Sequence, residues 1–181
     1  MKKTLLIFVF SFISVFSFAQ AFDEGTRVGS IGIGLGGTFG SYTTTSRMPA
    51  ISLQYEQGIW PISDKGVISL GGYLGTKSYK YAGSGYTQSW NYYVIGARSA
   101  FHYSGLNIEK FDPYAGLMLS YNYLKYRYDG PSTFPISGNY ASTVGFSGYL
   151  GGRYYFTPKF AGFGEVGFGI SYVTIGLAIK I

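Results

Sequence analysis

The chain alternates apolar residues with small or polar ones over most of its length, and this period of two limits the possible folds more than any other feature. Ile31, Ile33 and Leu35 alternate with glycines, and the final stretch repeats the pattern up to Ile181. Such alternation is typical of β-strands that have two different faces. Eight segments of this kind are predicted, at 31–36, 51–56, 68–75, 92–102, 114–122, 143–154, 160–168 and 172–181.

The connections between these segments alternate in length. Long polar loops are predicted at 37–49, 80–89 and 129–140, with shorter turns between them. Most of the predicted strands have about 9–13 residues, which is enough to cross a bilayer at a tilt. Long loops at one end and short turns at the other are typical of outer-membrane barrels, and an even strand number returns both termini to the periplasmic side. We therefore predict an all-β fold, an eight-stranded antiparallel up-and-down transmembrane β-barrel.

Two kinds of barrel are compatible with the alternation. A soluble, lipocalin-like barrel keeps its apolar side chains inside, whereas a membrane barrel turns them outward. Only 12% of the chain is charged, and the polar positions of the strands are mostly Gly and Ser. A surface that faces water would carry many more Lys and Glu. Aromatic residues also gather near the strand ends, where membrane-interface girdles lie. These features favour the membrane barrel.

The first nineteen residues have the pattern of a secretion signal. Lys2 and Lys3 precede an apolar run over 4–18, and Ala19 provides a small residue before the predicted cleavage site. A membrane anchor is the alternative, but the apolar run is shorter than about 20 residues and no basic cluster follows it. We predict a cleaved signal peptide at 1–19 and a barrel domain at 20–181.

The most distinctive stretch is Gly-Glu-Val-Gly-Phe-Gly-Ile-Ser-Tyr at 164–172, followed by the terminal strand. With this stretch and its strand layout, the chain resembles the outer membrane protein beta-barrel domain family, and in size it is similar to the small OmpA/OmpX-type barrels. The resemblance implies a monomer in the cell outer membrane of a Gram-negative envelope. It also implies that the terminal strand is read by the barrel-insertion machinery during assembly.

Few residues offer chemistry. The chain has no cysteine and a single histidine, His102, which excludes disulfides, thiolate sites and multi-histidine metal sites. The pattern G-x-G-x-x-G occurs at 32–37 and 162–167 but leads into no predicted helix, so we interpret it as inward-facing glycines of a narrow barrel. His102 is expected at the periplasmic end of its strand with no obvious Ser or Asp partner. We predict no catalytic residue, no cofactor and no metal site.

Four charged residues fall on positions that the alternation turns into the lumen. All four lie a few residues from a periplasmic turn, so we expect them at a similar depth; they are Glu56, Arg98, Arg153 and Glu165. An unpaired charge in a low-dielectric interior is costly, so these residues should pair. We expect Glu56 to contact Arg98 and Glu165 to contact Arg153. This lumen charge cluster is interpreted as a structural network that fills the lumen, with a plug or gate as the alternative.

The predicted outer end of the barrel is basic. Asp129 is opposed there by five cationic residues, Arg47, Lys77, Lys80, Lys125 and Arg127. This basic outer rim could contact phosphates or sugars of an anionic outer-leaflet glycolipid, or its charges could simply be solvated. Nucleic acid is not an expected partner, because an exported membrane barrel offers no soluble basic stripe.

These observations predict a non-enzymatic integral outer-membrane barrel with a structural or surface-interaction role. A narrow passive pore is the second possibility, although four inward tyrosines should crowd the lumen: Tyr73, Tyr92, Tyr114 and Tyr149. A lipid-active barrel enzyme is the third, and it would need a base beside a nucleophile at the outer face.

Overall fold

The computed structural model describes residues 21–37, 46–131 and 142–181, and these residues are mostly β-strand. In chain order the elements are β1 (Arg27–Leu35), β2 (Ser46–Arg47), β3 (Ala50–Pro61), the short 3₁₀ helix η1 (Ser63–Lys65), β4 (Gly66–Gly83), β5 (Tyr86–Tyr103), β6 (Phe111–Asp129), β7 (Thr143–Tyr155), β8 (Phe160–Phe168) and β9 (Val173–Lys180). The predicted leader at 1–19 and much of the predicted loops at 37–49 and 129–140 lie outside the described residues. No helix of the described ranges is long and apolar enough to cross a membrane.

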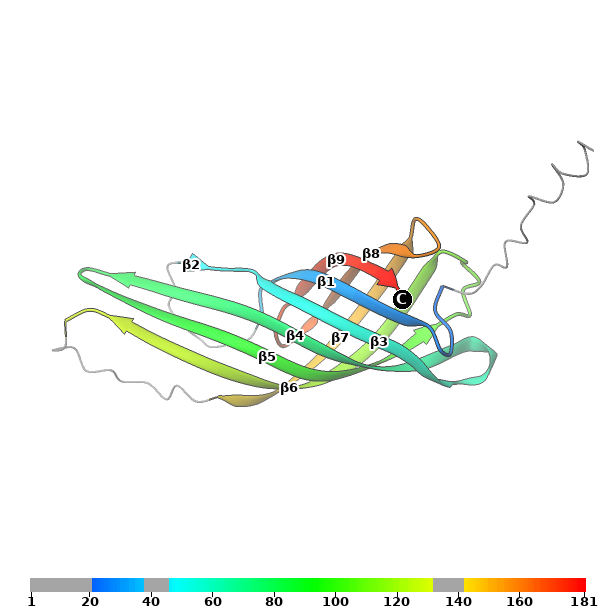
Figure 1. Ribbon diagram of the computed structural model, residues 1–181, viewed down its shortest axis with the longest axis horizontal. Coiled ribbons are helices and arrows are strands. Elements are labelled where there is room, and N and C mark those ends of the chain that lie inside the picture. The colour runs from blue at the N-terminus through cyan, green and yellow to red at the C-terminus, as the bar shows by residue number, and fades with distance from the viewer. Residues whose placement is uncertain (1–20, 38–45, 132–141) are drawn as a thin grey trace, which may run out of the picture.

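The strands form a closed barrel. Apart from the two-residue β2, which pairs with β4, each strand pairs antiparallel with the next one along the chain, and β1 also pairs with β9. Figure 1 shows the barrel from the side, with the short β1, β8 and β9 beside one another. Closure gives the backbone groups of β1 and β9 a partner, so the part of the wall that contains all eight strands has no open edge. The predicted eight-stranded antiparallel up-and-down barrel is therefore confirmed for the described residues.

The strands differ greatly in length, and this makes the two ends of the barrel unlike. Strands β4, β5 and β6 have 18, 18 and 19 residues, whereas β1, β8 and β9 have 9, 9 and 8. The three long strands consequently project beyond the rest as a three-stranded extension (Figure 1). We call the end with this extension the far end. The opposite, terminal end carries residues 21–26, the C-terminal Ile181 and the turn that contains η1.

The prediction of a long loop at 80–89 is wrong. Strands β4 and β5 stay paired from Gly66 and Tyr103 to Gly83 and Tyr86, so only a two-residue turn remains. Gly85 in that turn has φ of 83°, a conformation that glycine adopts at little cost. The polar composition of this stretch was misleading, because the strands of an extension beyond an apolar band need no apolar residues on their outer face.

The side chains are sorted in the opposite way to a soluble protein. Apolar side chains of alternate positions point outward, and Ile95, Leu119 and Leu177 are 60%, 59% and 61% exposed. The intervening positions point inward and bury polar groups such as Ser69 and Asn122, neither of which has any exposed surface. The face assignment made from the sequence is thus correct for these strands.

The lumen is filled along its length. Phe22, Val28 and Phe163 belong to a buried apolar cluster at the terminal end, and Tyr73 and Met118 belong to a second cluster in the middle. A third cluster lies inside the far end and is made of Tyr79, Trp90, Tyr92 and Leu124. The four tyrosines expected in the lumen point inward; Tyr149 is partly buried and the other three are buried.

Candidate functional site

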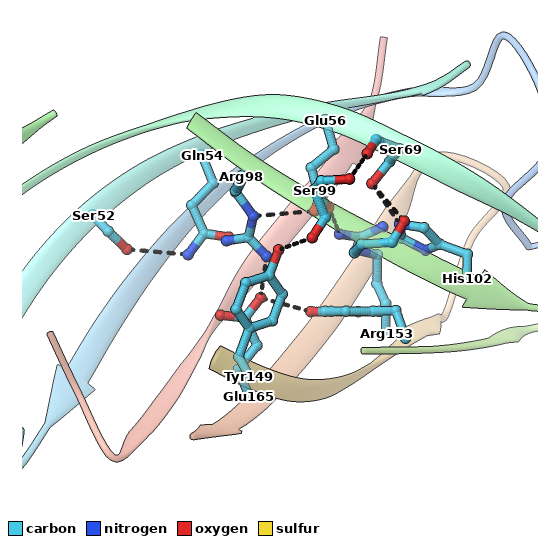
Figure 2. A network of polar contacts seen from close by, with 12 residues as sticks. Ser52, Gln54, Glu56, Ser69, Arg98, Ser99, His102, Tyr149, Arg153 and Glu165 are labelled. Carbon is cyan, nitrogen blue, oxygen red and sulfur yellow. Dashed lines mark hydrogen bonds and ion pairs between the residues drawn. The ribbon is translucent and has the colours of Figure 1, made fainter. Parts of the chain in front are cut away.

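The four predicted lumen charges meet in one buried network between the terminal end and the middle of the barrel (Figure 2). Arg98 Nε donates to Glu56 Oε1 at 3.1 Å, and Arg98 Nη2 donates to Glu165 Oε1 at 2.7 Å. Arg153 Nη2 donates to Glu56 Oε2 at 2.7 Å. Glu56 therefore bridges the two arginines, and each of the four side chains is at least nine-tenths buried.

Glycines at inward positions of the intervening strands make these contacts possible. Glu56 on β3 and Arg98 on β5 are both in register with Gly71 on the intervening β4. A Cβ on Gly71 would lie 1.8 Å from the carbonyl oxygen of Tyr55, so only glycine fits at this position. The space above Gly71 is left free, and the two flanking side chains meet across it.

The same arrangement recurs on the other side of the barrel. Tyr114 on β6 and Glu165 on β8 flank Gly151 on β7. The Tyr114 hydroxyl donates to Glu165 Oε1 at 3.0 Å, and its ring lies within 2.5 Å of where a Gly151 Cβ would stand. Inward glycines thus form part of the network, because each allows two side chains to bridge a strand.

The network contains two members that the sequence analysis missed. Asp112 Oδ2 accepts from Arg153 Nη1 at 2.9 Å, and Asp112 Oδ1 lies 2.7 Å from His102 Nδ1. Asp112 lies between the predicted strands 92–102 and 114–122, whereas β6 in fact begins at Phe111. Asp112 therefore points inward, as Tyr114 does two residues later. No Ser or Asp partner of His102 was obvious from the sequence. The sequence does contain a signal for the contact between His102 and Asp112. Both residues occupy inward positions of the alternation, at the neighbouring ends of two consecutive strands.

The expected pairing of Glu165 with Arg153 is not what the geometry provides. Arg153 makes its ion pairs with Glu56 and Asp112, and Glu165 is held by Arg98 and Tyr114. The reason is the register of Arg153 with the strands on either side of β7. Arg153 is in register with Asp112 on the adjacent β6, two residues nearer the terminal end than the row in which Gly151 faces Glu165.

Aromatic rings enclose the guanidinium groups. Arg98 Cζ lies 4.3 Å from the centroid of the Tyr149 ring, and Arg153 Cζ lies 5.1 Å from that of Tyr114. Cation–π contacts of this kind are strongest where water is excluded. Beside Arg98 and Tyr149, the remaining cavity has a volume of about 40 Å³, which is room for a few water molecules at most. The network fills its part of the lumen and leaves no wide passage there.

Ser69, His102 and Asp112 are linked in the order of a nucleophile, a base and an acid. His102 Nε2 lies 3.1 Å from Ser69 Oγ, while Nδ1 faces Asp112. Chemistry of this type also needs access for a substrate. Ser69 is fully buried, and the ring of Phe22 stacks on the imidazole at 3.8 Å with an interplanar angle of 12°. The arrangement therefore serves to satisfy the buried histidine, and it lies at the terminal end rather than near the extension.

The five residues of the predicted basic rim do not form one group. Lys80, Lys125 and Arg127 are exposed, and Lys80 and Arg127 flank Ser89 of β5 in register. Arg47 lies on β2, which pairs with β4 near Lys80, and nothing is described of its side chain. Arg127 Nε also contacts Asp129 Oδ2 at 3.0 Å, but an exposed pair of this kind contributes little.

The assignment of Lys77 to the rim is wrong. Its side chain points into the lumen and is 4% exposed. Lys77 Nζ donates to the carbonyl oxygen of Ile170 at 2.6 Å and to that of Gly36. It thereby joins β4 to the end of β1 and to the β8–β9 turn. The error arose from the predicted loop at 80–89, which placed Lys77 beside a loop. Because β4 continues to Gly83, Lys77 lies within the strand and points inward with Tyr73 and Tyr79.

The glycine-rich patterns lie on strands. The pattern at 32–37 covers the end of β1, and the one at 162–167 lies within β8, so neither precedes a helix. Gly162 and Gly164 face outward, with open space around Gly164, which corrects the expectation that these glycines point inward. Within the described residues no three or more potential His, Cys, Asp or Glu ligands gather around a metal position.

Partial burial against the barrel raises the pKa of Asp23, and the attraction of Lys180 only partly offsets this effect.

Comparisons with known proteins add little beyond the strand layout. No family model and no curated protein matches the chain. Among solved structures, the chain is similar to the outer membrane protein Ail of Yersinia pestis, determined as a backbone structure in a phospholipid bilayer nanodisc. The two share 16% identity over 87% of this chain and all of that chain, with a TM-score of 0.46. The role of this protein has to be inferred from its own strands, burial and charges.

A double-mutant cycle should distinguish direct partners from neighbours. Arg98→Met and Glu165→Gln together should cost less than the sum of the single changes, with a coupling energy of about 1–3 kcal/mol, because the two side chains share a buried ion pair. Arg153→Met with Glu165→Gln should give a smaller coupling, since these two side chains do not meet. The measurement is the free energy of unfolding in lipid vesicles by urea titration. Equal coupling in both cycles would contradict the geometry.

Replacing Lys77 should loosen the far end. Lys77→Met leaves the carbonyl oxygens of Gly36 and Ile170 without their buried donor, so we expect the free energy of unfolding to fall by about 1–2 kcal/mol. Lys80→Met removes an exposed lysine from the same strand and should change it by less than about 0.5 kcal/mol. A Lys77 variant as stable as the Lys80 control would show that the buried ammonium does not hold these turns together.

Proposed function

We propose that this protein is a non-enzymatic integral barrel of the cell outer membrane, with a structural or surface-interaction role and a filled lumen. The observation that supports this most directly is the inverted sorting of side chains. An outward apolar band surrounds an interior that holds Arg98, Arg153 and three carboxylates. Water would not favour so much exposed apolar surface on a monomer, whereas hydrocarbon does.

The orientation follows from the ends of the barrel. The predicted leader directs export, and the terminal end, with both chain ends and short turns, belongs on the periplasmic side. The far end, with the extension of β4, β5 and β6, then faces outward from the cell. In this proposal β9 is read by the insertion machinery, and its pairing with β1 closes the barrel within one chain, which is consistent with a monomer.

The two alternative functions are less well supported. A lipid-active enzyme would need its base and nucleophile at the outer face, but the Ser69–His102 pair is buried at the terminal end. A passive pore would need a continuous lumen, but the ion-pair network and the inward tyrosines occupy it. Both observations favour a filled, structural barrel.

The exposed basic residues of the extension indicate a partner. Lys80, Lys125 and Arg127 lie on its outer face beside the polar side chains of Ser89 and Asn91. Lys80 and Arg127, separated by two strand spacings or about 10 Å, border a groove of about 310 Å³. Lys and Arg bind phosphate groups through charge-assisted hydrogen bonds, so these cations support an anionic glycolipid as a partner. We therefore include an anionic outer-leaflet glycolipid among the proposed partners of the barrel.

The location can be tested by fractionation. We expect the mature chain to begin at Gln20 and to be recovered with outer membranes. The folded barrel should migrate differently on a gel before and after boiling, because the closed ladder resists detergent until it is heated. Recovery in the soluble periplasmic fraction would contradict the proposal.

The filled lumen can be tested by conductance. Purified protein in planar bilayers should give no steady channel of porin size, since eight strands enclose only a narrow interior that side chains occupy. A general porin in the same bilayer is the control. Large and stable conductance would make the passive pore the better function.

The glycolipid partner can be tested by charge removal. Adding an anionic glycolipid to zwitterionic liposomes should stabilise the barrel, and replacing Lys80, Lys125 and Arg127 by Gln should remove about 1 kcal/mol of that gain for each charge. The matched control replaces three exposed lysines of the terminal end, Lys65, Lys110 and Lys159. Equal loss in both triple variants would show that the extension has no special role.

A further inference from the structure

The first described residues of the chain lie inside the mouth of the barrel at its terminal end. Phe22 is 3% exposed, and Ala21 is buried beside it. Both belong to an apolar cluster with inward side chains of the barrel wall, among them Val28, Tyr155 and Phe163. A polar surface tail would leave such an aromatic residue in solvent. Phe22 is instead an integral part of the interior.

Phe22 also covers the end of the ion-pair network. Its ring stacks on His102 at 3.8 Å and lies 5.7 Å from Arg153 Cζ. His102 and Arg153 are each 1% exposed, although both lie near a barrel mouth. The Phe22 ring therefore covers the network on the side of the terminal end. Farther inside, the rings of Tyr149 and Tyr114 cover Arg98 and Arg153.

A tight backbone turn holds this segment in place. Gly25 N donates to Gly58 O at 2.9 Å, and Gly58 N donates to Thr26 O at 3.0 Å. Within the segment, Thr26 N donates to Asp23 O at 3.1 Å. A Cβ on Gly58 would stand 2.3 Å from the carbonyl oxygen of Asp23, so the close approach depends on that glycine.

Free space adjoins the segment. A cavity of about 220 Å³ lies between Ala21 and Phe22 on one side and the β5–β6 connection on the other, and His102 and Asp112 also line it. Phe22 covers one face of the imidazole, so its displacement would widen the access from this cavity to His102.

We propose that residues 21–26 are an N-terminal plug that closes the terminal mouth of the barrel and keeps the ion-pair network dry. The Phe22 side chain fills the mouth, and the turn at residues 23–26, packed against Gly58, holds it there. With the predicted cleavage after Ala19, Phe22 is the third residue of the mature chain, so the barrel is closed by its own processed N-terminus.

The test uses the only histidine of the chain as a reporter. Untagged, folded barrel in detergent is treated with diethyl pyrocarbonate, and modification of the His102 imidazole is followed by its ultraviolet absorbance and by peptide mass. Wild-type protein should react slowly, because His102 is reached only through local opening, and Phe22→Ala should react at least about tenfold faster. Phe160→Ala is the matched control, since that exposed ring lies in the same end of the barrel and should leave the rate unchanged.

A second variant keeps Phe22 and disturbs only the turn at residues 23–26. Gly58→Ala should displace the turn through the clash with Asp23 and also speed the reaction, whereas Gly164→Ala, which meets open space, should not. Gel mobility before and after boiling identifies the folded fraction, and Gly58→Ala decides the result if Phe22→Ala does not fold. Wild-type His102 that reacts as fast as in the urea-unfolded chain would overturn the plug. Folded variants of both kinds that react at the wild-type rate would also overturn it.

Discussion

Closure of the hydrogen-bonded ladder between β1 and β9 is the constraint on which the rest of this structure depends. Where all eight strands are present it leaves no edge unpaired, so the outer surface of this part can be apolar at every alternate position. Closure with only eight strands also fixes a narrow lumen. A narrow lumen cannot stay empty without losing packing, and its inward positions must therefore be filled with side chains that satisfy one another.

The interior meets this requirement with charge rather than with apolar residues alone. Glu56 bridges Arg98 and Arg153, and Asp112 joins Arg153 to His102. The bridges cross strands on which glycine replaces a side chain, as Gly71 shows. Ion pairs buried in this way contribute less to net stability than to the choice of a single arrangement, because breaking one leaves an uncompensated charge. The network consequently links β3, β5, β6, β7 and β8 in one defined register.

The two ends of the lumen are closed by different chemistry. At the terminal end an apolar ring, Phe22, lies against the network. At the far end the ammonium group of Lys77 binds carbonyl oxygens of Gly36 and Ile170, which cap the neighbouring strands. Beyond Lys77, the extension of β4, β5 and β6 carries exposed basic residues on its outer face, and there we propose contact with an anionic glycolipid.

The sequence by itself determined the number of strands, their faces and the presence of opposite charges in the lumen. These features depend on the period of two, which is local and survives without any knowledge of neighbours. The tertiary structure decided which charges meet. Whether Glu165 contacts Arg98 or Arg153 depends on strand order and stagger around a closed ring, and alternation carries no information about either. The same holds for Lys77 and Asp112. Both lie on inward positions of the alternation, but the predicted strands 68–75 and 114–122 were shorter than β4 and β6 and did not include them. It also holds for Phe22, whose place inside the barrel depends on a turn against Gly58 on another strand, because a contact between distant segments exists only once the barrel has closed.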